Sequence, residues 1–355
     1  MYIHPSANVF AVLLMISPTF LVVDKGSPWM QRPQPWQRQP EPVLSAYETK
    51  QSWSKVVLYS PHVLFRDGKF RMWYLGTSTA SRSSDMVLGY AESTDGIRWK
   101  EHPNNPILTG EDIPWGRVWQ TPFVLFDEDE KMFKMWFVSG DGVRRDKQGN
   151  VLSNDQRLGY ATSKDGIAWK VHPESIYPSG RSPSVIKEGP NHYRMWMNSR
   201  PDPKGAWDDI YKHIFEFSST DGIHWQRGKK PVIRPGGKIR STVYPFVLKI
   251  HGHYHMWYGG HTAKRFELFH ATSADGTKWT TDHQNPAFPA RSAKEFFDSR
   301  YTSTPCIVDL PNRYLLYYSA RDMRTTYTDK QGRKRQDKSG IYAHIGLAVM
   351  RKDGK

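Results

Sequence analysis

Short apolar stretches alternate with polar turns over most of this chain, at strand rather than helix spacing. In a representative part, residues 122–126 are apolar, and residues 132–138 are rich in aromatic and β-branched side chains. A third stretch, 158–162, precedes the Asp165-Gly166 pair, where glycine supplies the positive φ of a turn. Trp169 then begins a fourth stretch. The pattern predicts a unit of four short antiparallel strands.

A motif of the form Ser-x-Asp-Gly-x-x-Trp closes this unit and recurs along the chain. Its Asp-Gly pairs begin at 95, 165, 221 and 275, and a truncated copy follows at Asp353, so the separations are 70, 56, 54 and 78 residues. Repeats of this length indicate copies of one supersecondary unit. Five copies predict an all-β fold, a five-bladed β-propeller of four-stranded antiparallel blades over residues 50–355. Each Asp-Gly pair is expected to turn the chain between the third and fourth strands.

Residues 1–49 precede the first expected blade and leave two interpretations open. Residues 9–23 are apolar but interrupted by polar residues, and they are too short to span a bilayer. They read as a degenerate export signal, which favours a secreted or periplasmic protein over a cytoplasmic one, or as an edge strand that completes the last blade. That blade lacks a fourth strand of its own. The proline-rich residues 28–42 are expected to be an extended linker.

The composition suits packed sheets, with 14% aromatic residues, 27 Gly and 25 Pro. The single cysteine, Cys306, excludes a disulfide within the chain and is expected to be a buried apolar side chain. No phosphate loop, dinucleotide motif or nucleophile elbow is found, so no cofactor is expected. His251, His253 and His255 alternate, but Gly252 between them marks a turn, and we expect no metal site.

The blade motifs resemble those of a known superfamily. Met72-Trp73-Tyr74, the 158–163 stretch Leu-Gly-Tyr-Ala-Thr-Ser and the Asp-Gly-Ile-x-Trp turns are similar to the five-bladed propellers of glycoside hydrolase families 43, 32, 62, 68 and 130, over about residues 50–354. The likeness is closest to bacterial proteins of the family 43/32 type. It implies a carbohydrate ligand, held in a central funnel where the first strands of the blades begin.

The resemblance does not extend to the catalytic residues. It implies three carboxylates beside prolines of the inner strands, a base, a modulator and an acid. The corresponding positions hold Ser60, Ser182 and the Val243-Tyr244 pair, and we expect Ser60, Ser182 and Val243 to line the funnel there. Because glycoside hydrolysis normally uses two carboxyl groups, either other residues carry the chemistry or this propeller does not hydrolyse glycosides in the family's way.

Basic residues recur near the prolines that begin the blades. Arg117, Arg240 and Arg300 each lie five residues before such a proline, and Arg181 lies two before Pro183. Arginine suits bidentate binding of carboxylate, sulfate or phosphate, although a solvated charged rim would look the same. The residues expected to bind substrate are Arg117, Trp119, Gln120, Arg181, Ser182, Arg240, His261, Arg300, Tyr301 and Arg321.

The overall charge also favours an anionic partner. The net charge is +15, and residues 321–338 contribute seven basic and three acidic side chains. Such a field raises the association rate of anions. Nucleic acid is an unlikely ligand because none of its recognition motifs is found. We therefore expect a carbohydrate, and specifically an anionic one.

Four residues are candidates for catalysis. Asp298 and Asp141 are the carboxylates expected near the funnel, unless neighbouring arginines neutralise them, and His62 and Tyr244 are candidates for proton transfer, as a uronate lyase would require. Three functions stay open: a glycosidase-like or lyase-like enzyme with non-standard catalytic residues, a non-catalytic propeller that binds glycan, and a scaffold for protein interactions.

Overall fold

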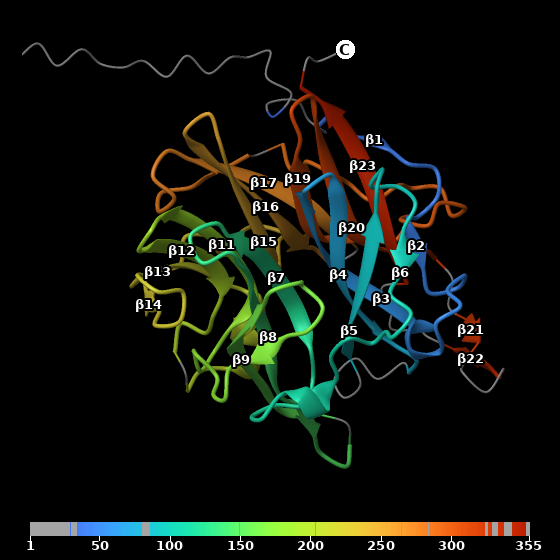
Figure 1. The fold of residues 1–355 in the computed structure, drawn as a ribbon, viewed down its shortest axis with the longest axis horizontal. Helices are drawn as coiled ribbons and strands as arrows, with labels where there is room; N and C mark the ends of the chain where they lie inside the picture. The colour runs from blue at the N-terminus through green and yellow to red at the C-terminus, as the bar shows by residue number, and fades with distance from the viewer. Residues whose placement is uncertain are drawn as a thin grey trace, which may run out of the picture.

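Five antiparallel blades surround a common axis (Figure 1). The computed structural model describes residues 29, 34–79, 86–148, 150–202, 204–263, 265–282, 284–323, 326–328, 333–336 and 343–352. Blades 1 to 3 are separate four-stranded sheets, whereas one parallel pair, Phe266 with Tyr301, links blades 4 and 5. The predicted all-β, five-bladed propeller is confirmed.

The first four blades share one order of strands. Blades 1 and 2 contain β3 (Val57–Arg66), β4 (Lys69–Thr77), β5 (Val87–Ser93), β6 (Lys100–Glu101), β7 (Gln120–Asp127), β8 (Met132–Arg145), β9 (Val151–Ser163) and β10 (Lys170–Val171). Blades 3 and 4 contain β11 (Arg181–Gly189), β12 (His192–Asn198), β13 (Ile214–Ser219), β14 (Gln226–Arg227), β15 (Ser241–Ile250), β16 (His253–His261), β17 (Phe266–Ser273) and β18 (Thr280–Thr281).

Blade 5 is completed by strands from both ends of the chain. Its strands are β19 (Tyr301–Asp309), β20 (Arg313–Arg321) and β23 (His344–Arg351), and the N-terminal β1 (Gln37–Arg38) and β2 (Leu44–Ser45) pair with β23. The interpretation of residues 28–42 as a linker without folded elements is therefore wrong for β1. An N-terminal edge strand does close the last blade, but it comes from residues 37–45. Residues 9–23 lie outside the described residues.

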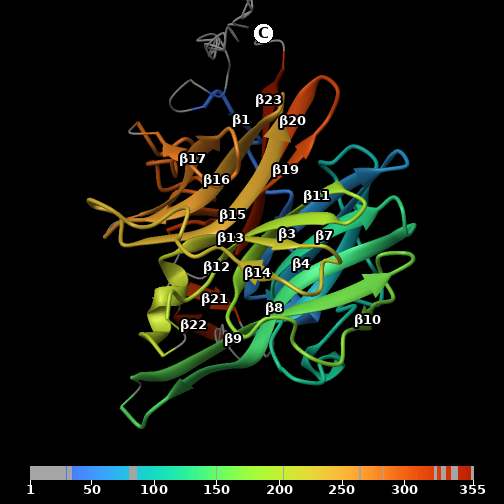
Figure 2. The ribbon, with the colours of Figure 1, turned by 90° about the vertical axis from the view of Figure 1, so that its left-hand side faces the viewer.

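The connections that follow the second strands lie on one side of the ring, which we call the rim. It carries the long hairpin of β8 and β9, the 3-10 helix η4 (Trp207–Tyr211) and the small sheet of β21 (Thr326–Thr328) and β22 (Lys334–Gln336), all seen on the same side in Figure 2. Two further 3-10 helices are η2 (Ser52–Ser54) and η3 (Gly110–Asp112). No helix in the described part of the chain has the length and apolar character that crossing a bilayer requires.

The repeated motif forms the same turn in blades 1 to 4. In blade 1, Asp95 Oδ1 accepts hydrogen bonds from the backbone N–H groups of Ile97 and Arg98, both at 2.8 Å, and Ser93 Oγ accepts from Gly96 N. Gly96 has φ of 77°, which glycine adopts without strain. The predicted position between third and fourth strands is confirmed for these four copies. Asp353 and Gly354 lie outside the described residues.

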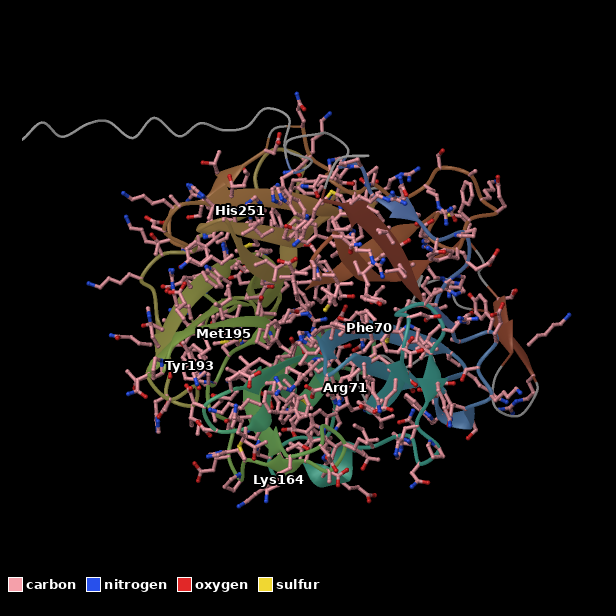
Figure 3. The ribbon with its side chains drawn as sticks, turned by 45° about the horizontal axis from the view of Figure 1, so that its top comes forward. Phe70, Arg71, Lys164, Tyr193, Met195 and His251 are labelled. Carbon is pink, nitrogen blue, oxygen red and sulfur yellow. The ribbon has the colours of Figure 1, made fainter. Side chains whose placement is uncertain are left out.

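The same turn also joins neighbouring blades. The tryptophan of the second strand donates from Nε1 to the carbonyl of the glycine in the next blade's turn, at 2.7 or 2.8 Å. The pairs are Trp73 with Gly166, Trp136 with Gly222 and Trp196 with Gly276. Tyr317 of blade 5 donates equivalently to Gly96 of blade 1. The second-strand aromatic residue and the Asp-Gly turn thus meet across these four boundaries, and Figure 3 shows the side chains that fill the spaces between blades.

The N-terminal segment supplies this joint between blades 4 and 5. Trp257 of blade 4 donates to Gln34 Oε1 at 2.9 Å, and Trp36 donates to the same oxygen at 3.1 Å. Trp29 packs between Trp257 and Tyr314, with ring centroids 5.1 and 4.6 Å away. Gln34 therefore takes the place of a glycine carbonyl and holds the ring closed at this boundary.

Candidate functional site

The centre of the propeller is built from five equivalent positions on the inner strands. Each is the residue just before the blade proline, each has φ between 42° and 59°, and each inner strand shifts register there. These residues, which we call the floor residues, are Ser60, Thr121, Ser182, Tyr244 and Thr304. Left-handed backbone is unfavourable for residues with a Cβ and needs support from its surroundings.

That support comes from the preceding blade. Ser60 N donates to Ser319 Oγ at 2.8 Å, Ser182 N donates to Thr121 Oγ1 at 3.0 Å, and Tyr244 N donates to Asn198 Oδ1 at 3.2 Å. The backbones of these three floor residues are therefore each held by a side chain from the neighbouring blade.

The floor residues and their prolines surround a central cavity of about 30 Å³. Ser60 and Ser182 line it, as the sequence predicted. In blade 4 Tyr244 lines it, and the prediction that Val243 would do so is wrong because Val243 points into the blade core with 2% exposure. No Asp or Glu is among the described residues that line this cavity.

Arg181 lies beside the floor and gathers oxygens from three other blades. Its Nη1 donates to Gln120 Oε1 at 2.6 Å and to Gln156 Oε1 at 3.0 Å. Its Nη2 donates to Tyr244 Oη at 2.8 Å and, more weakly, to Tyr59 Oη at 3.4 Å. The structure thus brings together Arg181, Gln120 and Tyr244, three of the residues predicted to form the site, with Ser182 adjacent on the floor.

A second layer holds this arrangement in place. Gln156 Nε2 donates to Asn154 Oδ1 at 2.9 Å, and Asn154 Nδ2 donates to Tyr211 Oη at 2.6 Å. The Tyr211 ring also lies 4.9 Å from the Arg181 guanidinium. We call the whole group the Arg181 cluster: Tyr59, Gln120, Asn154, Gln156, Arg181, Tyr211 and Tyr244.

The charge of Arg181 is buried without an opposite charge beside it. The residue is 7% exposed, and its hydrogen-bond partners are neutral amides and phenols. Within the described residues no carboxylate lies at ion-pair distance from it, and its Nε has no partner. Burial alone lowers the pKa of Arg181, but the nearby oxygens of Tyr244, Tyr59 and Tyr211 more than offset this, so its pKa is raised and the side chain stays cationic.

Aromatic side chains continue from this cluster toward the boundary of blades 4 and 5. The ring centroid of Phe266 lies 5.9 Å from that of Tyr244, 6.5 Å from that of Tyr301 and 5.3 Å from that of His261. Arg300 lies over the Tyr301 ring at 5.2 Å. Of the predicted binding residues, His261, Arg300 and Tyr301 are therefore half-buried along an aromatic path from Tyr244.

His261 is also electrostatically coupled to the rim. Burial, and then the positive charge of the exposed Arg240, lower the pKa of His261, which favours its neutral form. The Arg240 backbone N–H donates to the His261 carbonyl at 2.7 Å, so the two residues lie together as neighbours of the path.

Two predicted residues belong to a separate groove. Arg117 and Asp141 are exposed and line a depression of about 860 Å³ with Trp115 and Arg157. None of the residues that line it belongs to the Arg181 cluster. Asp141 is consequently not placed to act with Tyr244 or Arg181.

Asp298 has a structural role instead of the catalytic one considered for it. It is fully buried, it accepts from Arg38 Nη1 at 2.7 Å and from Tyr318 Oη at 3.0 Å, and it pairs with Arg291. Two arginines neutralise this carboxylate, which is the alternative to a catalytic role that the sequence left open for Asp298.

His62 is likewise unsuited to proton transfer. It is 3% exposed, and its Nε2 lies 2.7 Å from the Val124 carbonyl, to which only a protonated ring nitrogen can donate. Burial, partly offset by that hydrogen bond, lowers the pKa of His62 to about 3. The ring is therefore neutral at physiological pH and packs against Phe123, with centroids 4.4 Å apart.

The predictions for Trp119 and Arg321 are wrong. Trp119 is fully buried, donates to the Thr109 carbonyl at 2.6 Å and packs on Phe137, so it cannot stack on a sugar. Arg321 is 1% exposed and donates to Tyr47 Oη at 3.0 Å inside blade 5. Residues 324, 325, 329–332, 337 and 338 of the basic loop lie outside the described residues.

Cys306 is buried, as predicted. Its exposure is 1%, burial raises the pKa of its thiol to about 12, and its Sγ accepts a hydrogen bond from Val63 N. It therefore packs as part of the core.

Tyr59, Asn154, Gln156 and Tyr211 were not predicted from the sequence. Tyr59 could have been found, because it occupies the position two before the blade proline, as Gln120 and Arg181 do. In blades 1 to 3 the side chains at that position meet near the centre, whereas Val243, its equivalent in blade 4, is buried in the blade core. The position five before the proline, on which Arg117 and Arg240 were chosen, is on the exposed rim. Asn154 and Gln156 alternate on β9 and so share a face, and nothing local marks Tyr211.

Comparison with known proteins supports the fold and leaves the activity open. No family model matches the chain. A segment of 139 residues is 30% identical to the uncharacterized protein Rv1502 of Mycobacterium tuberculosis, which is 39% of this chain and 45% of that protein. The match thus spans less than half of the relative's length.

Solved structures match over most of the chain. One comes from work on the GH130 family of mannoside phosphorylases, which contains glycoside hydrolases that target β-1,2-mannosidic linkages in Candida mannan. Its TM-score is 0.64 at 17% identity, and the match covers 90% of this chain and 94% of that one. A thermostable family-43 glycoside hydrolase has a TM-score of 0.59 at 14% identity, covering 85% and 94%. An N-acetylgalactosamine deacetylase from F. plautii, in complex with blood group B trisaccharide, has a TM-score of 0.63 at 17% identity, covering 89% and 95%. The chain shares the propeller fold of these carbohydrate-active proteins.

Proposed function

We propose that the central funnel binds a carbohydrate carrying an anionic group, and that Arg181 provides the charge that recognises it. The observation that carries the proposal is a buried guanidinium whose described partners are all neutral. Removing a charge from water is expensive unless an opposite charge compensates it. A carboxylate, sulfate or phosphate on the ligand would supply that compensation.

The neutral partners of Arg181 are suited to contact such an anion. Gln120 and Tyr244 accept from Arg181 through their oxygens, which leaves the Gln120 amide N–H groups and the Tyr244 O–H free to donate. An anion placed against these donors would have the guanidinium charge directly behind them. Hydrogen bonds of this charged kind are stronger than those between neutral groups.

Two further observations support a sugar as the carrier of the anion. The half-buried rings of Tyr244, Phe266 and Tyr301 lie in succession, starting at Tyr244 beside Arg181, and rings of this kind pack on the apolar face of a sugar. Structures with the same fold come from work on glycoside hydrolases that target β-1,2-mannosidic linkages and from a deacetylase in complex with blood group B trisaccharide. The net charge of +15 would also accelerate association with an anionic glycan.

The floor favours recognition over ordinary glycoside hydrolysis. That reaction uses two carboxyl groups about 5–10 Å apart. The five floor residues are four serines or threonines and one tyrosine, so none of them carries a carboxyl group. Asp298 is paired with two arginines and Asp141 lies in a separate groove, so neither can take the place of a floor carboxylate.

A lyase-like reaction is the second candidate, and the contact between Arg181 and Tyr244 favours it. In a β-elimination on a uronate, a base takes the proton beside the carboxylate, the C–O bond on the next carbon breaks, a C=C bond forms and the leaving oxygen gains a proton. Arg181 would neutralise the carboxylate, and Tyr244, which accepts from Arg181 at 2.8 Å, would exchange the proton.

A glycan array with uronic, sulfated and neutral oligosaccharides tests the proposal. We expect retention of acidic glycans and none of their neutral counterparts. Incubation of the retained glycans, followed by ultraviolet absorbance for an unsaturated product and by reducing-end assay for hydrolysis, separates lyase, hydrolase and binding protein. Retention of neutral glycans alone would contradict an anionic ligand.

A further inference from the structure

One equivalent position faces the next blade at all five boundaries of the propeller. It is the residue just before the methionine or leucine in each second strand. In blades 1 to 5 this residue is Arg71, Lys134, Arg194, His255 and Leu315. Four of the five side chains carry nitrogen donors, and the fifth is a leucine.

The first three of these side chains reach across their boundary. The Arg71 guanidinium lies 5.8 Å from the Phe133 ring, Lys134 Nζ donates to Tyr193 Oη at 3.0 Å, and Arg194 Nη1 donates to the Asp275 carbonyl at 2.8 Å.

The fourth boundary is occupied differently. The His255 ring lies 5.6 Å from Trp29, which also contacts Tyr314 of blade 5. The aromatic side chain of Trp29, from the N-terminal part of the chain, therefore fills this boundary.

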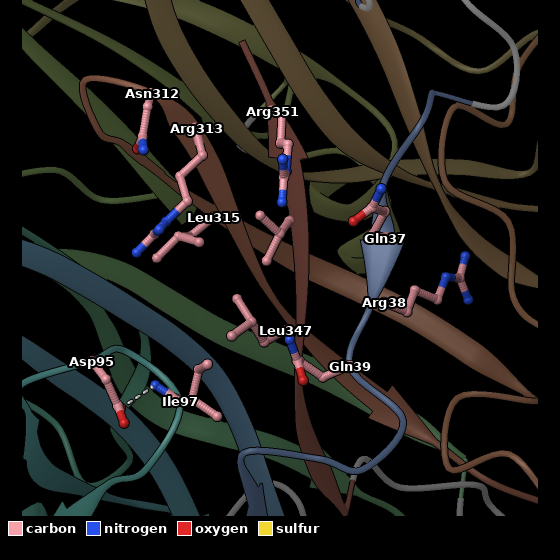
Figure 4. Close-up of a pocket in the computed structure, with 11 residues that line it drawn as sticks. Gln37, Arg38, Gln39, Asp95, Ile97, Asn312, Arg313, Leu315, Leu347 and Arg351 are labelled. Atoms are coloured by element: carbon pink, nitrogen blue, oxygen red, sulfur yellow. Dashed lines mark hydrogen bonds between the residues drawn. The ribbon is translucent and has the colours of Figure 1, made fainter. Parts of the chain in front are cut away.

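The boundary between blades 5 and 1 is open. A groove of about 490 Å³ lies there (Figure 4). Leu315, Leu347 and Val349 line its apolar side, but Leu315 and Leu347 are only 3% and 0% exposed. Its accessible apolar surface therefore comes from the half-buried Val349 and from Ile97 of the blade 1 turn, which is 45% exposed. Gln39, directly after β1, lies on the remaining side, with its amide toward the groove. Among the described residues, no side chain at this boundary corresponds to Arg71 or to Trp29.

Two positive charges stand at one end of the groove. Arg313 and Arg351 are direct cross-strand partners on β20 and β23, and both line the groove. Like charges placed opposite each other destabilise a sheet. In the part of the chain that the structure describes, neither arginine has an ion-pair partner.

The other charged residues of the groove are already engaged. Asp95 accepts from the Ile97 and Arg98 backbone and from Arg98 Nε at 2.8 Å, and Arg38 pairs with Asp298. The groove therefore presents the half-buried Val349 and the exposed Ile97 next to two cations that have no ion-pair partner among the described residues.

We propose that this groove is a docking site for an acidic peptide segment of another protein. An apolar side chain of the segment would lie against Val349 and Ile97, and a neighbouring carboxylate would bridge Arg313 and Arg351. At the preceding boundary Trp29 shows an aromatic side chain filling the equivalent space. The site is distinct from the funnel, and it stands whether or not the funnel binds a glycan.

Selection from a random heptapeptide phage library tests this proposal. The full chain is the target, and the double variant Arg313→Gln/Arg351→Gln is used for counter-selection. We expect enriched peptides to pair an aromatic or aliphatic residue with Asp or Glu. The synthetic consensus peptide should bind the double variant at least about tenfold more weakly, as the loss of a charge-assisted hydrogen bond implies.

Matched controls separate the groove from general charge. The variant Lys170→Gln/Lys278→Gln removes two exposed charges elsewhere and should bind the peptide like the unmodified protein. Ile97→Ser should weaken binding without loss of either arginine. Failure to enrich peptides over the double variant, a consensus without acidic residues, or equal affinity for both double variants overturns the proposal. Self-association that only Arg313→Gln/Arg351→Gln abolishes would assign the groove to a second copy and also overturn it.

Discussion

Trp73 and Gly166 are joined across the boundary of blades 1 and 2, where Trp73 Nε1 donates to the Gly166 carbonyl at 2.7 Å. The contact explains why the two parts of the repeat, the tryptophan of the second strand and the Asp-Gly turn, occur together. Blades 1 to 3 each donate to the turn of the next blade and blade 5 donates to the turn of blade 1, whereas Gln34 is the acceptor for blade 4.

Replacing Trp136 by phenylalanine tests the contribution of this contact. The variant removes the buried bond to Gly222 and leaves its carbonyl unsatisfied, so the free energy of unfolding should fall by about 1–3 kcal/mol in addition to any packing loss. Urea denaturation measures this. Trp99→Phe is the matched control, because Trp99 Nε1 is buried without a hydrogen-bond partner in the described structure. A loss for Trp99→Phe as large as for Trp136→Phe would show that packing alone accounts for the effect.

Gln34→Ala should destabilise the ring more than its position near the N-terminus suggests. The variant leaves the Nε1 groups of Trp257 and Trp36 without their acceptor, and each orphaned buried donor costs about 1–3 kcal/mol. The melting temperature should fall clearly, while Glu41→Ala, an exposed change in the same segment, should leave it unchanged. Equal melting temperatures for the two variants would mean that Gln34 does not hold the boundary.

His62 should make the protein less stable in acid. Its pKa is about 3 in the folded protein and about 6.5 when unfolded, so the unfolded chain binds the extra proton between these values. The contribution of neutral His62 to the free energy of unfolding is complete above pH 6.5 and is lost as the pH falls toward 3. The loss is on the order of 2–3 kcal/mol between pH 7 and 4. In His62→Gln the pH dependence of unfolding should be flatter over this range. The exposed His251→Gln should retain the original slope, and unchanged slopes in both variants would contradict a buried neutral His62.

The fold could be predicted from the sequence because its repeat records contacts between blades. The Asp-Gly turns and the second-strand tryptophans are local signals that five blades reproduce. The closing strands could not be predicted in the same way, because β1 and β2 have two residues each and depend on β23, which lies some 300 residues away in sequence. Nothing in residues 28–42 themselves distinguishes a linker from an edge strand.

The site was predicted less completely, for a geometric reason. The bulge at each floor residue decides which side chains of the inner strand reach the axis. Selecting those side chains from the sequence requires knowing how many residues before the blade proline they lie. Arg181, at two residues before the proline, is central, whereas Arg240, at five, is exposed. Trp119 and Asp298 are fully buried and therefore cannot contact a ligand in the funnel. Their burial depends on the packing of neighbouring blades, which the local sequence does not show.

The rim arginines should contribute less to ligand binding than Arg181 does. Arg117 and Arg240 are exposed, so solvent and salt screen their charges. Replacing either arginine by Ala should therefore weaken the binding of an acidic glycan by less than about fivefold. The loss should shrink further as the salt concentration rises, which titrations at two ionic strengths would measure. A tenfold or greater loss that persists at high salt would place the anion at the rim.

The most direct test of the account is calorimetry with a matched pair of ligands, the best acidic glycan and its carboxyl-reduced or desulfated counterpart. The unmodified protein should bind the acidic member about ten- to a hundredfold more tightly, the range expected for one charge-assisted hydrogen bond. Two variants should reduce this preference. Tyr244→Phe removes a hydrogen-bond donor beside Arg181, and Arg181→Lys keeps the positive charge but loses the paired donors of the guanidinium. Their melting temperatures would confirm that both proteins are folded. Equal affinity for the two ligands, or an undiminished preference in both folded variants, would contradict the assignment of Arg181 as the centre of an anion site.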